Sequence, residues 1–235
     1  MVLRVLNTLG ASEHIGARLL CGPPREALER CPELQDGVDH GDWDWVENQE
    51  TPSTSAHYAL QRLPATVPVL LTTADHALLS NEIVDYFCAQ ANLAGYDLVV
   101  GLALYAEVMA ANPGVKRTGL RFRENTYCGC NLFAMISPQA RKVADFWRRA
   151  EQDRKRPWRL IRRLGWVSVL RFLLGRLTLD EALRRLSKRL GIHIGYVLLP
   201  YPEAAVDVDT ESDWRYVQRV VPTGDEAVPP KELRA

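Results

Sequence analysis

The sequence predicts an α/β protein, in which a mostly parallel, Rossmann-like sheet is flanked by helices and carries a basic helical insertion. Apolar runs of strand length alternate with amphipathic stretches along the chain, as expected of β-α-β units. The run at 67–71 is apolar at nearly every position, which is typical of a strand buried on both faces. At 235 residues the chain is long enough for one domain with an insertion.

The residues before this central run predict short helices and strands. Strands are expected at 17–23 and 45–48, and helices at 2–9, 24–31 and 51–64. Gly10 and Pro64 supply helix ends, and the hydroxyls at 51–55 supply a helix start. The acidic stretch at 32–42 is expected to be a loop.

The residues after the central run continue the alternation and then become basic. Helices are expected at 81–95, with Ser80 as the N-cap, and at 138–153 and 211–221. Strands are expected at 96–104, 194–202 and 204–209. Two strands joined by a turn at Glu124 and Asn125 are expected within 119–136, and basic helices continue to Leu190. We therefore expect one domain at 1–221, with a helical insertion at about 152–190 and a flexible tail at 222–235.

Acidic side chains end two of the expected strands. Asp75 follows the central run, and Asp207 and Asp209 end the later strand at 204–209. Ligands bind at the carboxyl edge of open α/β sheets, and two carboxylates converging there would suit a magnesium ion that bridges phosphates. A structural alternative remains for each, namely a turn aspartate at Asp75 and a helix cap formed by Thr210 and Asp213.

Three further stretches carry polar groups that a phosphorylated ligand needs. Hydroxyl and N–H groups at 51–55 either hold an anion or a nucleobase edge, or simply cap a helix. Gly129 and Asn131 either line a substrate pocket or mark a strand bulge. Arg121 either grips a phosphate or is a solvated surface residue, and His76 is the only histidine at the proposed site.

Cysteine usage and hydropathy indicate a cytoplasmic protein. The five cysteines are scattered and odd in number, which fits reduced thiols better than a disulfide framework. The close pair Cys128 and Cys130 is expected to fill small core spaces rather than bind zinc. Arginines interrupt every long apolar run, and the first residues lack a signal-peptide pattern.

Charge is distributed unevenly along the chain. Residues 141–189 hold sixteen Lys or Arg and five Asp or Glu, a net charge of +11, and the remainder carries −11. Such asymmetry favours an anionic partner for one face. Within 154–177 a leucine stripe flanked by arginines favours helices packed on the domain core, with a helix lying on the anionic inner face of a membrane as the alternative. Nucleic acid is not expected as a partner.

The stretches PVLLTTADHALLS, YCGCNLFAM and VDVDTESDW, in this order, resemble landmarks of the MobA-like nucleotidyltransferases, or NTP transferases. The resemblance covers about residues 1–221 and implies a GT-A-type fold. It also implies a Mg2+-dependent transfer of a nucleoside monophosphate from a triphosphate, CTP or GTP, to a phosphorylated small-molecule acceptor, with release of pyrophosphate. In that family, residues matching Asp75 and Asp207 or Asp209 hold magnesium, and a serine matching Ser55 lies near the base.

Combining the resemblance with the candidate stretches gives a set of expected roles. Asp75 and Asp209 are expected to be catalytic, and Asp207 to join them in holding the metal. The expected nucleotide-binding residues are Ser53, Thr54, Ser55 and Ala74, and the expected substrate-binding residues are His76, Arg121, Gly129 and Asn131.

The family pattern begins earlier than this sequence does. Its members start with a strand and a glycine-rich loop ending in a lysine, which hold the triphosphate, whereas this sequence starts at the following helix. An N-terminally truncated form of reduced activity is therefore expected. Two alternatives remain: a nucleotide-sugar glycosyltransferase of related fold, and a non-catalytic membrane- or RNA-binding module that has lost the nucleotide loop.

Overall fold

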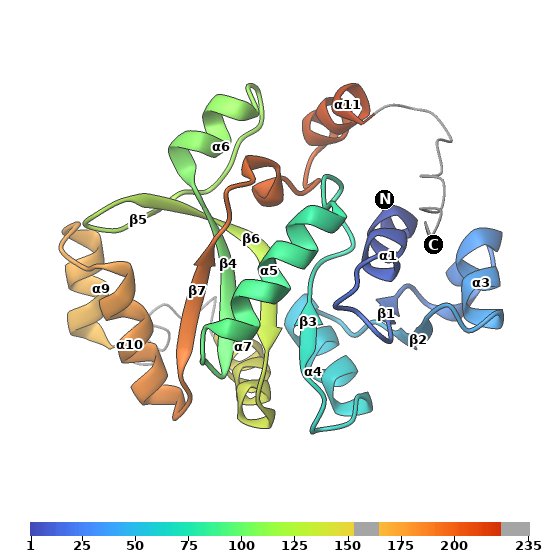
Figure 1. The fold of residues 1–235 in the computed structure, drawn as a ribbon, viewed down its shortest axis with the longest axis horizontal. Helices are drawn as coiled ribbons and strands as arrows, with labels where there is room; N and C mark the ends of the chain where they lie inside the picture. The colour runs from blue at the N-terminus through green and yellow to red at the C-terminus, as the bar shows by residue number, and fades with distance from the viewer. Residues whose placement is uncertain (153–164, 222–235) are drawn as a thin grey trace, which may run out of the picture.

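A computed structural model describes residues 1–152 and 165–221 of the protein (Figure 1). Its strands are β1 (Leu19–Gly22), β2 (Asp44–Glu47), β3 (Val69–Leu71), β4 (Leu98–Leu104), β5 (Leu120–Arg121), β6 (Thr126–Met135) and β7 (Ile194–Leu198). Its α-helices are α1 (Val2–Gly10), α2 (Arg25–Leu28), α3 (Pro32–Asp39), α4 (Pro52–Arg62), α5 (Asn81–Leu93), α6 (Tyr105–Ala111), α7 (Lys142–Gln152), α9 (Trp166–Leu173), α10 (Leu179–Leu190) and α11 (Glu211–Val220). Two short 3-10 helices are η1 (Pro138–Arg141) and η2 (Pro202–Ala205).

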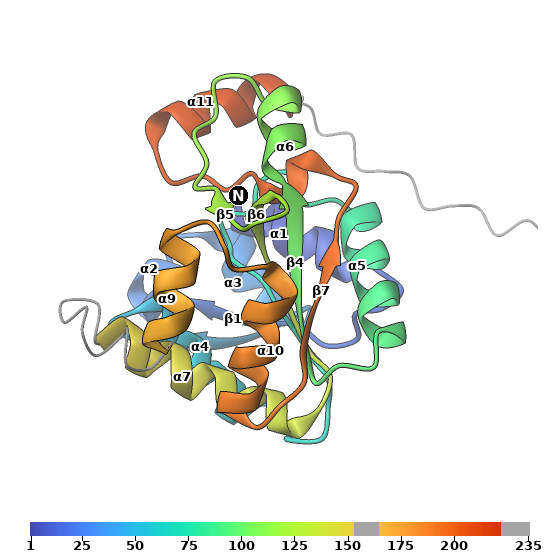
Figure 2. The ribbon, with the colours of Figure 1, turned by 90° about the vertical axis from the view of Figure 1, so that its left-hand side faces the viewer.

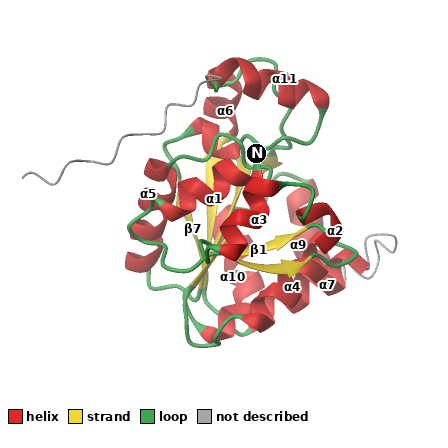
Figure 3. Ribbon diagram, turned by 90° about the vertical axis from the view of Figure 1, so that its right-hand side faces the viewer, coloured by secondary structure: helices red, strands yellow, loops and turns green. Residues whose placement is uncertain are grey.

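The central sheet has the strand order β3-β6-β4-β7, and β5 pairs with β6. Strands β4 and β7 are parallel, and both β3 and β4 are antiparallel to β6, so three of these four strands run in one direction. A separate parallel pair, β1 and β2, lies beside this sheet (Figure 3). The predicted α/β class with a mostly parallel sheet flanked by helices is confirmed.

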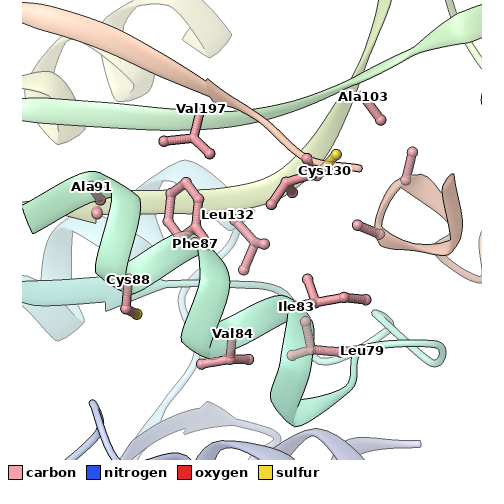
Figure 4. Close-up of a cluster of buried hydrophobic side chains, with 14 of the residues drawn as sticks. Leu79, Ile83, Val84, Phe87, Cys88, Ala91, Ala103, Cys130, Leu132 and Val197 are labelled. Atoms are coloured by element: carbon pink, nitrogen blue, oxygen red, sulfur yellow. The ribbon is translucent and has the colours of Figure 1, made fainter. Parts of the chain in front are cut away.

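Helices cover both faces of the central sheet (Figure 2). On one face α5 buries Ile83, Val84 and Phe87 completely, against Leu132 of β6 and Val197 of β7 (Figure 4). This face forms the larger core. Apolar side chains of α4, α7 and α10 pack on the other face.

The smaller sheet has a core of its own. Leu6 of α1, Leu20 of β1 and Leu34 of α3 pack around Trp43. The acidic stretch at 32–42, expected as a loop, is therefore mainly the helix α3. Its proline stands in the first helical turn, where a missing N–H costs nothing, and Leu34 provides the apolar contact.

Local capping chemistry gave the correct starts for three helices. The side chains of Thr51, Ser80 and Thr210 accept backbone N–H bonds at the starts of α4, α5 and α11. Thr210 and Asp213 form a complete capping box, which confirms the structural alternative for this stretch. The turn at Glu124 and Asn125 also joins two antiparallel strands as predicted.

Two further expectations were wrong, and one helix was not expected. Strand β3 is only half-buried, and Val67 before it is 51% exposed, because β3 is an end strand that pairs with β6 alone. Residues 204–209 form no strand; η2 occupies their beginning, and an extended stretch follows. Helix α6, directly after β4, had no counterpart in the sequence-based prediction.

The cysteines lie as expected for structural thiols. All five are free, and Cys128 and Cys130 of β6 are almost completely buried. Burial raises the pKa of both thiols, so neither is a ready thiolate at neutral pH. Among the described helices, none is both long enough and apolar enough to cross a bilayer.

Candidate functional site

The candidate site lies where the loop between β3 and α5 meets the segment that precedes α11. The backbone N–H of Val208 donates a hydrogen bond of 3.1 Å to the carbonyl of Asp75. Residues 207–209 therefore lie directly against Asp75, although more than a hundred residues separate them in the sequence. This contact also explains why the predicted strand at 204–209 is absent, since Val208 bonds to a loop rather than to a neighbouring strand.

The carboxylate of Asp207 is held by two side chains. The Nδ2 atom of Asn131 donates a 2.7 Å hydrogen bond to it. The guanidinium of Arg117 forms an ion pair with the same carboxylate and also donates to the carbonyl of Asp207. The Arg117 side chain is only 8% exposed, so this pair is largely shielded from solvent.

The carboxylate of Asp75, by contrast, has one oxygen without a described partner. Its Oδ1 atom is buried and has no hydrogen-bond partner among the described residues. A buried carboxylate oxygen without a donor is costly, unless a cation or a ligand completes it. Asp75 and Asp207 thus provide carboxylate oxygens of the kind that magnesium prefers.

A metal bound here would take only part of its coordination shell from the protein. Within residues 1–152 and 165–221, no group of three or more His, Cys, Asp or Glu side chains is arranged to hold a metal ion. Magnesium usually binds through one or two carboxylates and completes its shell with water and substrate phosphates. A magnesium ion held by these two aspartates would therefore need water and a ligand phosphate to complete its shell.

His76 lies beneath the site rather than facing it. Its side chain is 1% exposed, and its Nδ1 atom is 3.3 Å from the hydroxyl of Thr72. The pKa of His76 is lowered to about 4, mainly by burial; the backbone of Ala204 and the charge of Asp75 raise it, and the charge of Arg117 makes a smaller contribution that lowers it. The histidine is neutral at pH 7. The expected direct contact between His76 and substrate is corrected to a supporting position under Asp75.

Asn131 is held in an unusual backbone conformation. Its φ of +50° makes it the single described residue other than glycine in the left-handed region. The pairing of β4 with β6 shifts register between Val100 and Leu102, opposite this part of β6. This bulge turns the amide of Asn131 toward Asp207, and such conformations are common where a strand re-aims a side chain at a site.

Gly129 lies two residues before Asn131 on the same strand. It is exposed, and a Cβ atom added there would meet nothing within 4 Å. Open space therefore adjoins the aspartate cluster at this point. Arg121 and Asp209 are also exposed, and among the described contacts neither is joined to Asp75 or Asp207 by a hydrogen bond or an ion pair.

The hydroxyls expected to bind the nucleotide are engaged in local contacts. Thr54 completes the capping box with Thr51, and the Ser55 hydroxyl accepts a 2.8 Å bond from the N–H of Gln49. Ser53 binds the carboxylate of Glu151 through both its hydroxyl and its N–H. The first turn of α4 thus already holds an anionic group, as the N–H groups at a helix start favour.

A cavity of about 620 Å³ lies beside these regions, although neither Asp75 nor the hydroxyl residues at 53–55 line it. Apolar side chains of α1, β1, α4 and β3 form most of its wall. Ala56 at the start of α4 and Ala74 beside Asp75 both line it. Its volume lies within the range of small-molecule pockets, which is about 300–1,000 Å³.

Arg117 is the residue that the sequence-based assignment missed. It lies in the loop between α6 and β5, which buried Val115 anchors. Asn112 adds a second anchor, because its Oδ1 accepts a 2.9 Å bond from the hydroxyl of Tyr216 in α11. The only sequence signal was a basic pair, Lys116 and Arg117, in a loop before the expected β-hairpin.

Comparisons with known proteins agree with this architecture. Neither the family models nor the curated proteins that were searched match the sequence. Among solved structures, a 4-diphosphocytidyl-2C-methyl-D-erythritol synthase from Anaerococcus prevotii is similar at 13% identity and a TM-score of 0.55, over 93% of this chain and 85% of that one. At this identity the likeness shows the fold alone, an α/β sheet flanked by helices.

A second structure is closer in sequence. It is a hypothetical transferase from Thermus thermophilus, with 34% identity and a TM-score of 0.64 over 72% of each chain. The chain belongs to the same family as this Thermus protein. The solved structures that this chain resembles are thus named as a transferase and a synthase.

Proposed function

We propose that the protein is a Mg2+-dependent nucleotidyltransferase of the MobA-like type. A phosphate oxygen of the acceptor attacks the α-phosphorus of a nucleoside triphosphate. The bond between that phosphorus and the oxygen bridging to the β-phosphate breaks, and pyrophosphate leaves. The observation that carries the proposal is the unpartnered, buried oxygen of Asp75 in a loop held against Asp207.

The two aspartates have the principal role. We assign Asp75 and Asp207 as the protein's magnesium ligands, with Asp209 as an alternative to Asp207. Bound magnesium would neutralise charge on the triphosphate and on the leaving pyrophosphate. Asn131 orients the Asp207 carboxylate by its 2.7 Å hydrogen bond, so that little reorganisation is needed when the ligand arrives.

Arg117 is a second source of positive charge. Its ion pair with Asp207 neutralises that carboxylate in the unliganded protein. When a cation binds Asp207, the guanidinium becomes available to a phosphate oxygen, for which its planar fork is well suited. The position of Arg117 therefore supports the proposal that its guanidinium binds a phosphate of the acceptor or of the triphosphate.

The nucleotide and the acceptor would approach the aspartates from different sides. The cavity lined by Ala56 and Ala74 supports the proposal that a nucleoside binds on the side of α4. Ser53, Thr54 and Ser55 lie in the first turn of that helix. The open space at Gly129 supports an acceptor on the β6 side, near Asn131. Arg121, on the neighbouring strand β5, is a further candidate for binding its phosphate. Because one structural neighbour is named for a diphosphocytidyl compound, CTP is the first triphosphate to test, followed by GTP.

Pyrophosphate release is the direct test. The protein is mixed with each nucleoside triphosphate, magnesium and a panel of sugar phosphates and polyol phosphates, with the Asp75→Asn variant as the control. We expect release with one pair of substrates, and its loss in the variant or with excess chelator. Release with no pair would overturn the proposal. Transfer from a nucleotide sugar instead would identify the glycosyltransferase alternative.

A further inference from the structure

Helix α9 exposes a continuous apolar surface. Five large side chains are exposed: Trp166 66%, Val167 52%, Leu170 44%, Leu173 75% and Leu174 58%. They follow one another at helical spacing, so all five lie on one side of the helix. We call this surface, formed by residues 166, 167, 170, 173 and 174, the α9 face.

The opposite side of α9 is fixed to the protein. Phe172 packs edge-on against Phe122, with ring centroids 5.5 Å apart. Arg171 forms a 2.9 Å ion pair with Glu181 of α10, and Arg185 of α10 donates a 3.0 Å bond to the hydroxyl of Ser168. These contacts orient the helix and leave the α9 face outward. The expectation that the leucine stripe packs on the domain core is therefore wrong for residues 166–174, whose large apolar side chains face outward. Residues 154–164 of the same stretch lie outside the described residues.

Positive charge surrounds the α9 face. Residues 165–190 hold six Lys or Arg and two Asp or Glu, a net charge of +4, and Arg176, Arg184 and Lys188 are exposed. Residues 29–50 hold eight Asp or Glu and one Arg, a net charge of −7. Figure 1 places these two regions at opposite edges of the molecule, α9 and α10 at the left and α3 at the right. A negatively charged surface would therefore attract the protein with the α9 face first.

We infer that the α9 face docks the protein onto an anionic lipid bilayer. An interfacial helix combines apolar side chains, a tryptophan and flanking cations, because it inserts its apolar side into the acyl boundary while its cations meet lipid phosphates. All three features are present. A second copy of this chain is a poorer occupant, since pairing through α9 would bring two basic regions together. RNA is also a poorer occupant, because it offers no apolar surface to the four aliphatic side chains of the α9 face.

Vesicle flotation tests this inference with the whole protein. The protein is mixed with vesicles of phosphatidylcholine alone, or with one third phosphatidylglycerol. The docking variant is Leu170→Glu/Leu173→Glu. The matched control is Leu93→Glu on α5, because Leu93 is 82% exposed but lies outside the basic region. We expect the wild type and the control to float with anionic vesicles, and binding to weaken as salt rises.

The docking variant should bind anionic vesicles at least about tenfold more weakly, since two apolar anchors become charged. Its circular dichroism is compared with that of the wild type, and Leu173→Ser provides a milder second variant that should also weaken binding. Equal flotation of wild type and both variants would overturn the inference. Equal binding to neutral and anionic vesicles would do so as well. A dimer that both variants abolish, with no flotation, would identify the α9 face as a protein interface and overturn it too.

Discussion

The aspartate cluster, formed by Asp75 and Asp207, and the α9 face are both unusual in a globular protein, but for opposite reasons. At the cluster, polar groups are buried, and one carboxylate oxygen of Asp75 has no described hydrogen-bond partner. On α9, large apolar side chains are exposed although the other side of the helix is well packed. Buried unpaired polar groups and exposed apolar patches are both uncommon in proteins, and each is informative for that reason. The two proposals assign different uses to these features, a small charged ligand at the first and a lipid surface at the second.

Truncating one core side chain and one side chain of the α9 face compares how much a buried and an exposed residue contribute to the free energy of unfolding. Phe87→Ala removes a ring that is completely buried between α5 and the sheet, so we expect the free energy of unfolding to fall by about 3–5 kcal/mol. Leu173→Ala should change it by less than about 0.5 kcal/mol, because Leu173 is exposed. Urea unfolding followed by circular dichroism measures both. A large loss for Leu173→Ala would mean that α9 is part of the core.

The buried histidine beneath the cluster predicts a pH dependence of stability. Its pKa is about 4 in the folded protein and 6.5 in the unfolded chain, so the unfolded chain binds more protons between these values. The stabilisation is complete above pH 6.5 and is lost as the pH falls toward 4, by a total of about 3 kcal/mol. Thermal unfolding of wild type and His76→Gln at pH 7 and near pH 4.5 measures it. Parallel pH profiles for the two proteins would show that His76 is not the cause.

The pair of Arg117 and Asp207 predicts coupling between the two side chains. Arg117→Met leaves the Asp207 carboxylate without its cation, and we expect a loss of about 2 kcal/mol. Asp207→Asn in the same chain removes the uncompensated charge and should recover part of that loss. A double-mutant cycle measured by urea unfolding gives the coupling. Additive effects would contradict a direct pair.

Replacing Asn131 by glycine is expected to have the smallest effect on stability. The same change tests whether the geometry of the site matters for activity. Asn131→Gly relieves the left-handed backbone at φ +50°, which favours the variant by up to about 1 kcal/mol. The same change removes the hydrogen bond to Asp207 and should offset that gain. We therefore expect nearly unchanged stability with reduced pyrophosphate release. Full activity would show that the orientation of Asp207 does not depend on this amide.

Much of the fold followed from local rules in the sequence. The starts of α4, α5 and α11 were predicted because Thr51, Ser80 and Thr210 carry oxygens that cap helix N–H groups. The helix starts depend on chemistry that is visible within a few residues. The meeting of Asp75 with the segment at 207–209 was also expected, from the rule that strand ends share one edge of a sheet, but it occurs through a loop, because residues 204–209 form no strand.

The features that were missed depend on distant partners. Apolar alternation at 204–209 predicted a strand, yet the N–H of Val208 bonds to the carbonyl of Asp75 in a loop. The place of Arg117 beside Asp207 depends on a loop held by Val115 and Asn112, and no local pattern encodes it. The same limit applied to α9, since periodicity revealed its apolar stripe but not whether that stripe faced the core or solvent.

Metal-dependent nucleotide binding tests the central claim most directly. Calorimetric titration of the protein with a non-hydrolysable CTP or GTP analogue, with and without magnesium, is compared among wild type, Asp75→Asn, Asp207→Asn and Asp209→Asn. We predict that magnesium strengthens binding in the wild type, and that this effect falls at least about tenfold in the first two variants but persists in Asp209→Asn. An unchanged magnesium effect in Asp75→Asn would contradict the proposed site.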